Sequence, residues 1–289
     1  MKKSYILLHI AIILAGFTGI FGKLISLNEG LLTWYRVLFS AIFLFIILKL
    51  FKISHQISNE EKWRMAKVGM LITIHWVFFY ASIKYSNISI GVICYSLTSF
   101  FTALFKPLID KNKFVFTEII LSSLTLLGIS LMFHFDSSYQ LGIVLGIVSS
   151  AFASLYTIYS EKLVSRYDSK VINYYQMIGG TVGLGLLLPI YLHFFPAEMV
   201  LPSWKDFLYL IVLSVFCTVG LYVTVTEVLK KISAFTVNLS FNLEPVYAII
   251  IAFLFFNEGK EVSFSFYAGL FFIMLSVILQ SLISTRKSK

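Results

Sequence analysis

Long apolar runs separated by short polar segments dominate the pattern of this chain. Ten of these runs are close to 20 residues long, which is about the length that a helix needs to cross roughly 30 Å of hydrocarbon. Almost no amphipathic helix lies between them, so the pattern favours membrane spans over the buried helices of a water-soluble core. The predicted spans are 4–26, 31–51, 65–84, 88–109, 115–134, 140–160, 171–194, 207–227, 233–255 and 264–284. We therefore expect an all-α polytopic membrane protein with ten transmembrane helices.

The composition supports this fold class. Of the 289 residues, 58% are apolar and 13% are charged, whereas a soluble domain carries about 25% charged residues. The net charge of +9 raises the question of nucleic-acid binding, but a nucleic-acid binder gathers its Lys and Arg residues on one solvated face. Here they lie in short clusters between apolar runs, so no nucleic-acid partner is expected. Cys94 and Cys217 both lie inside apolar runs and do not indicate a disulfide framework.

The distribution of basic residues predicts how the chain is oriented. If the N-terminus is inside, the inner segments carry 18 Lys and Arg residues and the outer segments carry 4, while Arg36 lies within a span. Such an excess is typical of cytoplasmic loops, so we predict a multi-pass protein of the cytoplasmic (inner) membrane with both termini in the cytoplasm. The first run, from Ser4 to Gly22, has 19 uncharged residues, more than a signal-peptide core usually has, so we expect it to be kept as a span.

The chain also repeats itself after about half its length. The segment 80–89 aligns with 224–233 at an offset of 144, and 31–36 aligns with 171–176 at an offset of 140. Because five spans per copy is an odd number, the second copy has to enter the membrane from the opposite side. We therefore predict two inverted five-helix repeats, 1–138 and 139–289. Inverted repeats are common in secondary transporters, which bind their substrate near the membrane midplane between the repeats.

Several segments are similar to the EamA-type transporters of the drug/metabolite transporter superfamily. Phe78–Ser86 (FFYASIKYS) resembles the end of the third helix of that family, and Leu243–Glu258 (LEPVYA followed by FFNE) resembles its ninth helix. Arg36 occupies the place of an arginine often found in the second helix, and Gly269 fits the last helix. The chain departs from the family in its fourth helix, where Ser99 and two phenylalanines stand at a common proline position. The resemblance implies a central cavity lined by helices one, three, four, six, eight and nine, and export of a small metabolite such as an amino acid or a related compound.

Glu244 is the acid closest to the middle of a predicted span. An ionised carboxylate at that depth is costly, so such a group normally faces protein or a water-filled cavity. We expect Glu244 to be neutral and either to contact the solute or to couple proton movement to transport. The alternative is that a protonated Glu244 caps backbone groups that a kink at Pro245 sets free.

Other polar and aromatic residues are candidates for the substrate pathway, and each also has a structural interpretation. Asn238 and Asn242 share one helix face, where they suit either a polar solute or a neighbouring helix. A membrane histidine or aromatic ring is often a packing residue, and Arg36 could snorkel to the outer surface or form an ion pair. Charges at span ends are read as interfacial anchors, namely Lys106, Glu118, Glu227 and Glu258. The pathway candidates besides Glu244 are Arg36, His75, Trp76, Tyr80, Tyr95, Ser96, Thr98, Tyr156, Tyr159, Asn238 and Asn242.

Two other classes of membrane protein are alternatives to a transporter. An intramembrane enzyme would need a carboxylate pair, a metal-binding helix or a serine with a base. All four aspartates lie in loops and the five histidines have no metal-ligand spacing, so no catalytic residue, metal or cofactor is predicted. A channel or a scaffold remains the alternative. The favoured prediction is a secondary transporter that works by alternating access and whose partners are a small-molecule solute and the lipid bilayer.

Overall fold

The computed structural model describes residues 2–53, 57–132, 139–244, 247 and 264–287, and this part of the chain is almost entirely helical. Seven helical stretches within it are long and apolar enough to cross a membrane. They are α1 (Lys2–Leu24), α2 (Glu29–Leu50), α3 (Asn59–Tyr85), Ile90–Asp110, α7 (Gln140–Leu163), α8 (Ser169–Phe194) and Trp204–Leu229. Each coincides with a predicted span to within a few residues, which confirms a multi-pass membrane protein.

The other three predicted spans are also helical over most of the residues that the structure describes. Two of them, α6 (Phe116–Met132) and α13 (Phe264–Lys287), contain shorter apolar stretches. The predicted span 233–255 is described over α11 (Ala234–Phe241) and the residues up to Glu244. The rest of that span, which includes Pro245 and the predicted kink, lies outside the described residues, so the count of ten helices stays a prediction.

Polar side chains fix where several helices begin. A serine, asparagine or aspartate at such a start accepts a hydrogen bond from a backbone N–H of the first turn, and this pairs a donor that the helix itself leaves unpaired. The residues that do so are Asn28, Ser58, Asn87, Asp168, Ser203 and Ser233. The start of each of these helices is therefore determined by a capping side chain as well as by the hydrophobicity of the segment.

Two of the membrane-crossing stretches are interrupted near their middle. The first consists of α4 (Ile88–Tyr95) and α5 (Leu97–Asp110), which meet at Ser96. The second runs from α9 (Trp204–Ser214) through the π-helix η2 (Val215–Gly220) into α10 (Leu221–Leu229). Irregular backbone at membrane depth is tolerated where it is buried in protein or lines a cavity, and π-helical turns often lie at functional sites.

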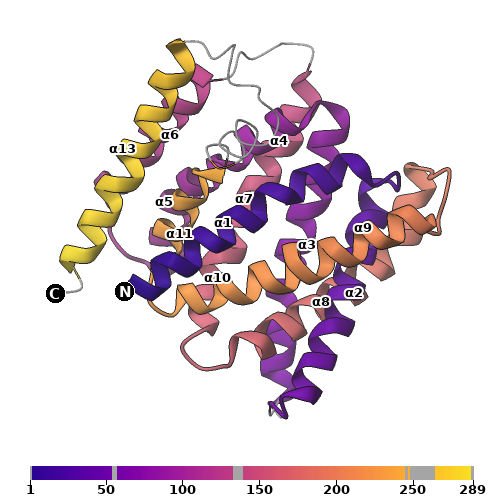
Figure 1. Ribbon diagram of the computed structural model, residues 1–289. Coiled ribbons are helices and arrows are strands. Elements are labelled where there is room, and N and C mark those ends of the chain that lie inside the picture. The colour runs from indigo at the N-terminus through magenta and orange to yellow at the C-terminus, as the bar shows by residue number, and fades with distance from the viewer. Residues whose placement is uncertain (1, 54–56, 133–138, 245–246, 248–263, 288–289) are drawn as a thin grey trace.

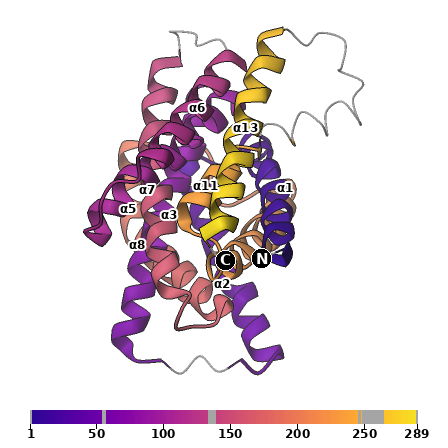
Figure 2. The same cartoon turned by 90° about the vertical axis from the view of Figure 1, so that its left-hand side faces the viewer.

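Figures 1 and 2 show the helices as one bundle in which the two halves of the chain are interleaved. Helix α3 packs against α7 and α8, α2 packs against α8, and α1 packs against α10. Helices α6 and α13 pack against each other at the left-hand side of Figure 1, next to α5 and α11. The start of α1 and the end of α13 lie at the same end of the molecule in both views.

The crossing of α3 and α8 is unusually close. A Cβ atom on Gly69 would lie 1.9 Å from the carbonyl oxygen of Gln176, and one on Gly179 would lie 2.3 Å from that of Ala66. Only glycine fits at these positions, since any larger side chain would meet backbone atoms. Small residues let membrane helices approach closely, so at this crossing the two halves of the chain are in direct backbone contact.

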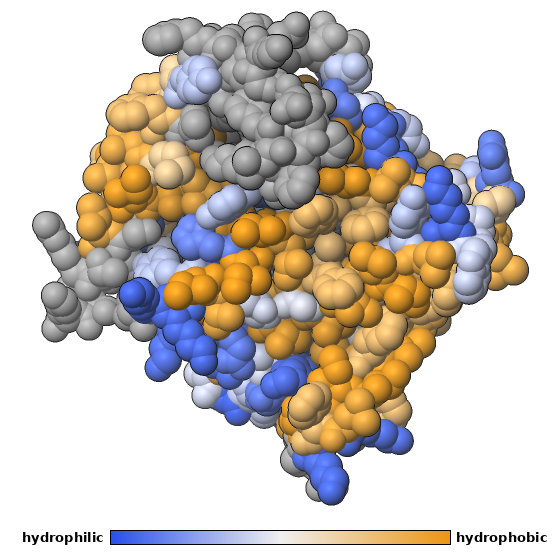
Figure 3. Space-filling model, viewed as in Figure 1, coloured by the Kyte–Doolittle hydropathy of each residue, from blue (hydrophilic) through white to orange (hydrophobic). Residues whose placement is uncertain are grey.

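The surface matches a membrane location. Figure 3 shows a broad hydrophobic belt across the middle of one face, with hydrophilic residues gathered near the start of α1 and, at the opposite end, near the start of α9. Many large apolar side chains on α1, α2 and α8 are exposed, among them Ile20, Ile46 and Leu186. This pattern is expected when lipid rather than water surrounds the helices.

Candidate functional site

A small cavity of about 30 Å³ lies in the interior of the bundle, between helices of both halves. It is lined by Ala15 and Thr18 of α1, His75, Trp76 and Phe79 of α3, Tyr95 of α4, Leu221 and Tyr222 of α10, Phe241 of α11, and Glu244. Both interrupted stretches contribute, because Tyr95 ends α4 and Leu221 begins α10. The helix breaks therefore lie directly beside the cavity.

Glu244 is the acidic residue of the lining. Its side chain is 5% exposed, and no described residue donates a hydrogen bond to its carboxyl group. A Cβ atom on Gly16 of α1 would lie 3.9 Å from the Cγ atom of Glu244, so α1 packs beside the acid. The hydroxyl group of Thr18 in the same lining is buried and lies beside the Cys217 thiol, and it makes no hydrogen bond of ordinary geometry within the described part of the chain. Glu244 and Thr18 thus place two polar groups in the cavity lining.

Aromatic rings form most of the cavity wall. The His75 ring lies 5.4 Å from that of Tyr95, and Tyr95 meets Phe241 edge to face at 6.3 Å. On the other side, the Trp76 indole donates its N–H to the Tyr222 hydroxyl at 3.1 Å. Such a wall suits a small solute with an apolar or planar part.

Ser149 of α7 holds the His75 ring. The Nδ1 atom lies 2.8 Å from the Ser149 hydroxyl and 3.1 Å from its carbonyl oxygen, while the hydroxyl donates to the His75 carbonyl at 3.0 Å. One consistent assignment follows, in which Nδ1 carries the proton and Nε2 is the acceptor of a neutral ring. His75 thus offers an acceptor as well as an aromatic surface.

Arg36 of α2 is fully buried behind this wall. Its guanidinium group donates to the Thr218 hydroxyl at 2.7 Å, the Tyr80 hydroxyl at 2.8 Å and the Cys217 carbonyl at 2.8 Å. The alternative that Arg36 snorkels to the surface is therefore wrong. Among the described residues no acid lies within 4.0 Å of it, so neutral dipoles and the Trp76 ring surround its charge.

Four other pathway candidates make local or helix–helix hydrogen bonds and do not line the cavity. Asn238 donates to Thr102 at 2.8 Å, and Asn242 donates to Ser99 at 3.2 Å, so both asparagines tie α11 to α5. The hydroxyl groups of Ser96 and Thr98 donate to backbone carbonyls one turn earlier, at 3.3 and 2.5 Å. These contacts favour the structural interpretation, and a role in solute binding stays a prediction.

Of the other tyrosine candidates, two are buried among the helices and one is exposed. Tyr156 is buried, donates to Gln176 at 3.2 Å and packs edge to face on Tyr222, while Tyr80 is engaged by Arg36. Tyr159 is 38% exposed and lies under the Lys162 ammonium group, away from the cavity. The cavity lining therefore contains Glu244, His75, Trp76 and Tyr95 from the predicted set.

Sequence reasoning missed several residues of the lining, chiefly Thr18, Tyr222 and Phe241. The family resemblance implies that the first, eighth and ninth helices line the cavity, and these are the helices that carry the three residues. Nothing in the chain itself indicates which face of each helix is turned inward. A tyrosine in the middle of the apolar run 207–227 was the one available signal, because a buried phenol needs a hydrogen-bond partner.

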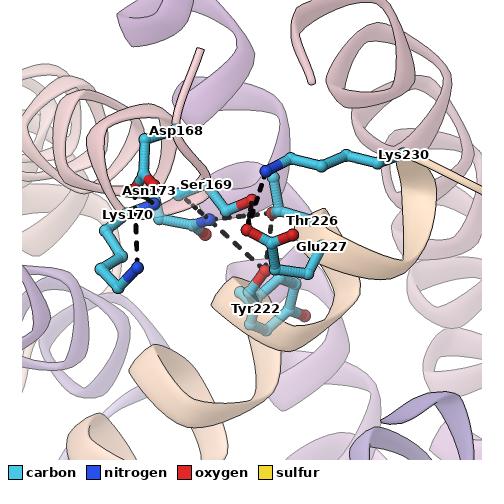
Figure 4. Close-up of polar contacts among 8 residues, drawn as sticks. All are labelled: Asp168, Ser169, Lys170, Asn173, Tyr222, Thr226, Glu227 and Lys230. Carbon is cyan, nitrogen blue, oxygen red and sulfur yellow. Dashed lines mark hydrogen bonds and ion pairs between the residues drawn. The ribbon is translucent and has the colours of Figure 1, made fainter. Parts of the chain in front are cut away.

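Polar contacts close the end of the bundle that is predicted to face the cytoplasm. Figure 4 shows Glu227 near the end of α10 accepting a hydrogen bond from Ser169 at the start of α8 at 2.8 Å, with Lys230 joining it at 2.8 Å. Next to them the Asn173 amide donates to the Thr226 hydroxyl at 2.8 Å (Figure 4). Glu227 is therefore a helix cross-link and not merely an interfacial anchor.

Lys106 likewise does more than anchor a helix end. Its ammonium group lies 2.5 Å from Glu161 of α7, and the other carboxylate oxygen of Glu161 accepts the backbone N–H of Ala234 at 3.0 Å. Lys162 forms a second ion pair with Asp110 at 2.6 Å. These contacts join α5 of the first half to α7 and α11 of the second.

A further set of contacts closes the opposite end of the bundle, which is predicted to face outward. The Asp206 carboxylate at the start of α9 accepts both the backbone N–H of Ser26 at 3.0 Å and its hydroxyl at 2.5 Å. Lys84 donates to the carbonyl of Leu27, and Tyr191 donates to Glu29. The loop between α1 and α2 is thereby tied to the second half. Over the residues that the structure describes, no group of three or more histidine, cysteine or acidic side chains could hold a metal ion.

Comparisons with known proteins identify the family. The model of the EamA-like transporter family matches the chain twice, over 2–134 and 140–282. A protein of Clostridium kluyveri named as an uncharacterized transporter is 23% identical over 295 residues, which cover 96% of this chain and 93% of its own length. The uncharacterized transporter YdfC of Bacillus subtilis is 25% identical over 237 residues, covering 80% and 76%. A solved crystal structure superposes over the full length of both chains with a TM-score of 0.75 at 14% identity, so it shares the fold. With both halves matched, the chain belongs to the EamA-like transporter family.

Proposed function

We propose that this membrane transporter moves a small metabolite, such as an amino acid or a related compound, across the cytoplasmic membrane by alternating access, in the outward direction. The observation that carries the proposal is the small cavity between the two halves, which is lined by Glu244 together with aromatic side chains. An apolar cavity with a few convergent polar groups is the usual form of a small-molecule site.

The size of the cavity favours a carrier over a permanently open channel. About 30 Å³ is room for one or two water molecules, which is far too small for a metabolite. The lining helices therefore have to separate before a solute enters. Contacts such as Lys106–Glu161 at the inner end and Ser26–Asp206 at the outer end hold both sides together in this conformation. Alternating access would break one set while the other persists.

The packing pattern supports two inverted repeats, 1–138 and 139–289. If the halves are exchanged, α3 corresponds to the stretch α9–α10 and α7 corresponds to α1. The contact of α3 with α7 then becomes that of α10 with α1, and both exist. The pairs α2 with α8 and α6 with α13 map onto themselves, as pairs across a two-fold axis do. A shared end for the start of α1 and the end of α13 fits a topology with both termini in the cytoplasm.

The chemistry of the lining supports the proposed solute class. The described lining contains one acid, one neutral imidazole acceptor and several rings, and Arg36 lies behind the wall with its donors engaged. A compound with several negative charges would need unengaged Arg or Lys groups. A small compound with an amino group for Glu244 and an apolar part for the rings fits better. Because a carboxyl group can exchange its proton with a solute or with water, Glu244 is also the candidate for proton coupling.

Counterflow in proteoliposomes tests this function. The purified protein is reconstituted into vesicles loaded with one unlabelled metabolite from a panel, and uptake of the labelled compound is followed. A carrier gives transient accumulation above equilibrium that saturates with concentration, because the loaded site crosses in both directions. Uptake that is neither saturable nor accelerated by the internal solute would favour the channel, and no flux for any compound would favour the scaffold.

A further inference from the structure

A groove of about 420 Å³ runs along the bundle surface between α3 and α8, far from the central cavity. Its walls are apolar and are formed by Ala66 and Met70 of α3 and by Ile178, Val182 and Leu186 of α8. Val182 is 56% exposed and Leu186 is 73% exposed, so the groove opens toward the surrounding hydrocarbon. Nothing in the proposed transport cycle uses it.

Glycines make this groove a preformed feature. A Cβ atom on Gly183 would lie 2.1 Å from the Met70 sulfur, and one on Gly179 would lie 2.3 Å from the Ala66 carbonyl oxygen. Since neither glycine has a side chain, the surface of α8 is recessed at this point. The close helix crossing beneath it keeps the walls in place.

One end of the groove is cationic and aromatic. The Lys62 ammonium group lies 6.0 Å from the centre of the Tyr175 ring, and it donates to Asn59 at 3.3 Å. The Lys67 ammonium group lies 5.5 Å from the ring of Trp63, although Lys67 is one turn further along α3, so its side chain extends back toward the helix start. In the part of the chain that the structure describes, neither lysine has an acid within 4.0 Å.

The length of the groove matches one leaflet of a bilayer. Eleven residues of α8 separate Tyr175 from Leu186, which corresponds to about 16 Å along a helix axis. The hydrocarbon core of a membrane is roughly 30 Å thick, so the groove extends over about half of it. Tryptophan and tyrosine at the charged end occupy the depth at which these residues are enriched in membrane proteins.

We propose that this groove binds a phospholipid with an anionic head group. Lys62 and Lys67 bind the head group, Trp63 and Tyr175 lie at the level of the interface, and an acyl chain lies along Met70 and the apolar residues of α8. Basic clefts between membrane helices on the cytoplasmic side are suited to anionic head groups. A second copy of the chain fits less well, because a two-fold contact would place the same unneutralised lysines of both copies opposite each other.

The test compares two lipids that differ only in the charge of their head groups. The full-length protein in detergent is titrated with dioleoyl-phosphatidylglycerol or dioleoyl-phosphatidylcholine, and bound lipid is counted by native mass spectrometry. We expect phosphatidylglycerol to bind on the order of 10- to 30-fold more tightly, since each lysine near the surface contributes about 1 kcal/mol. The double variant Lys62→Gln/Lys67→Gln should lose this preference. The matched control Lys113→Gln/Lys231→Gln removes two exposed inner lysines outside the groove and should keep it.

A second variant tests the apolar part of the site. Val182→Trp fills the groove from its exposed side, and it should lower binding of both lipids while thermal stability stays near that of the wild type. The proposal is overturned if the two lipids bind equally to the wild type, or if the control loses the preference as fully as the groove variant does. It is also overturned if the wild type is a dimer that Val182→Trp converts to a monomer, because the groove would then be a protein interface.

Discussion

The guanidinium carbon of Arg36 lies 3.8 Å from the centre of the Trp76 indole ring, and the same indole lines the central cavity. Arg36 therefore contacts the cavity wall at Trp76 but does not itself line the cavity. Its hydrogen bonds to Cys217 and Thr218 also attach α2 to the π-helical turn η2 just before Leu221 enters the lining. A single side chain thus connects the first half to the break in the second.

Arg36→Lys should destabilise the protein and lower transport. Lysine cannot reproduce three donors in fixed directions or stack its charge flat on the indole, so buried acceptors lose their partners. We expect a loss of about 1–3 kcal/mol in stability, which a lower melting temperature in detergent would report. Arg166→Lys, at an exposed inner position, is the matched control. If both variants melt and transport like the wild type, Arg36 has no role in holding η2 or Trp76.

Lys106→Gln should open the inner end more often. The variant removes the charge that pairs with Glu161, and the cross-link between α5 and α7 weakens. A cysteine at Thr98 lies about two turns deeper on α5, so its reaction with a small maleimide reports inner opening. We expect labelling to be roughly five- to tenfold faster than with Lys106 intact.

The comparison for that experiment is Lys162→Gln, which breaks the neighbouring pair with Asp110. The Lys162 side chain is 41% exposed and that of Lys106 is 24% exposed. Water therefore solvates the separated charges of the Lys162–Asp110 pair more easily, and this pair contributes less to keeping the helices together. Labelling should rise less in this variant. Equal rates in the wild type and both variants would mean that these ion pairs do not hold the inner side closed.

The inverted topology predicts opposite labelling of two exposed loop positions in the second half. In a background without Cys94 and Cys217, a cysteine at Glu198 should react with an impermeant maleimide added outside intact cells. A cysteine at Ser165 should react only after the cells are broken. Both positions are exposed, so accessibility alone does not separate them. The reverse pattern would contradict the orientation derived from the Lys and Arg distribution.

Much of the fold could be predicted because its determinants are local. A run of about 20 apolar residues is recognisable as a membrane span from the sequence alone, and capping residues such as Asn87 and Ser203 mark where helices start. The family resemblance of Phe78–Ser86 and of the segment around Glu244 is confirmed by the double match to the EamA-like family. The structure places Glu244 in the cavity lining, where the sequence drew attention to it because a carboxyl group at membrane depth is costly and has to face a cavity or protein.

Which side chains line the cavity, and where a helix is irregular, depends on how the helices face each other, and no local sequence pattern specifies this. Asn238 and Asn242 have the chemistry of solute ligands, but Thr102 and Ser99 of α5 accept their hydrogen bonds. Tyr159 lies on the same helix as Tyr156, three residues on, yet it turns outward. The π-helical turn in the span 207–227 has no proline to mark it. Contacts with a distant partner decide each of these cases.

Glu244 is the residue on which the transport mechanism can be tested most directly. It lines the cavity, it is buried, and no described residue donates a hydrogen bond to it. Glu244→Gln keeps the shape of the side chain and removes the titratable proton. If the acid couples protons, net transport in the variant should no longer respond to a pH gradient, while counterflow at equal pH continues.

The alternative role of Glu244 predicts a different result. If the acid only caps backbone groups near the end of α11, Glu244→Gln should behave as the wild type does. Glu244→Ala should then lose about 1–3 kcal/mol of stability, because a buried polar group is left unpaired. Net transport, counterflow and detergent melting curves of both variants, each measured at two pH values, separate the two roles. Wild-type behaviour in every one of these measurements would show that Glu244 neither couples protons nor supports the helix end. The substrate site would then lie elsewhere in the bundle.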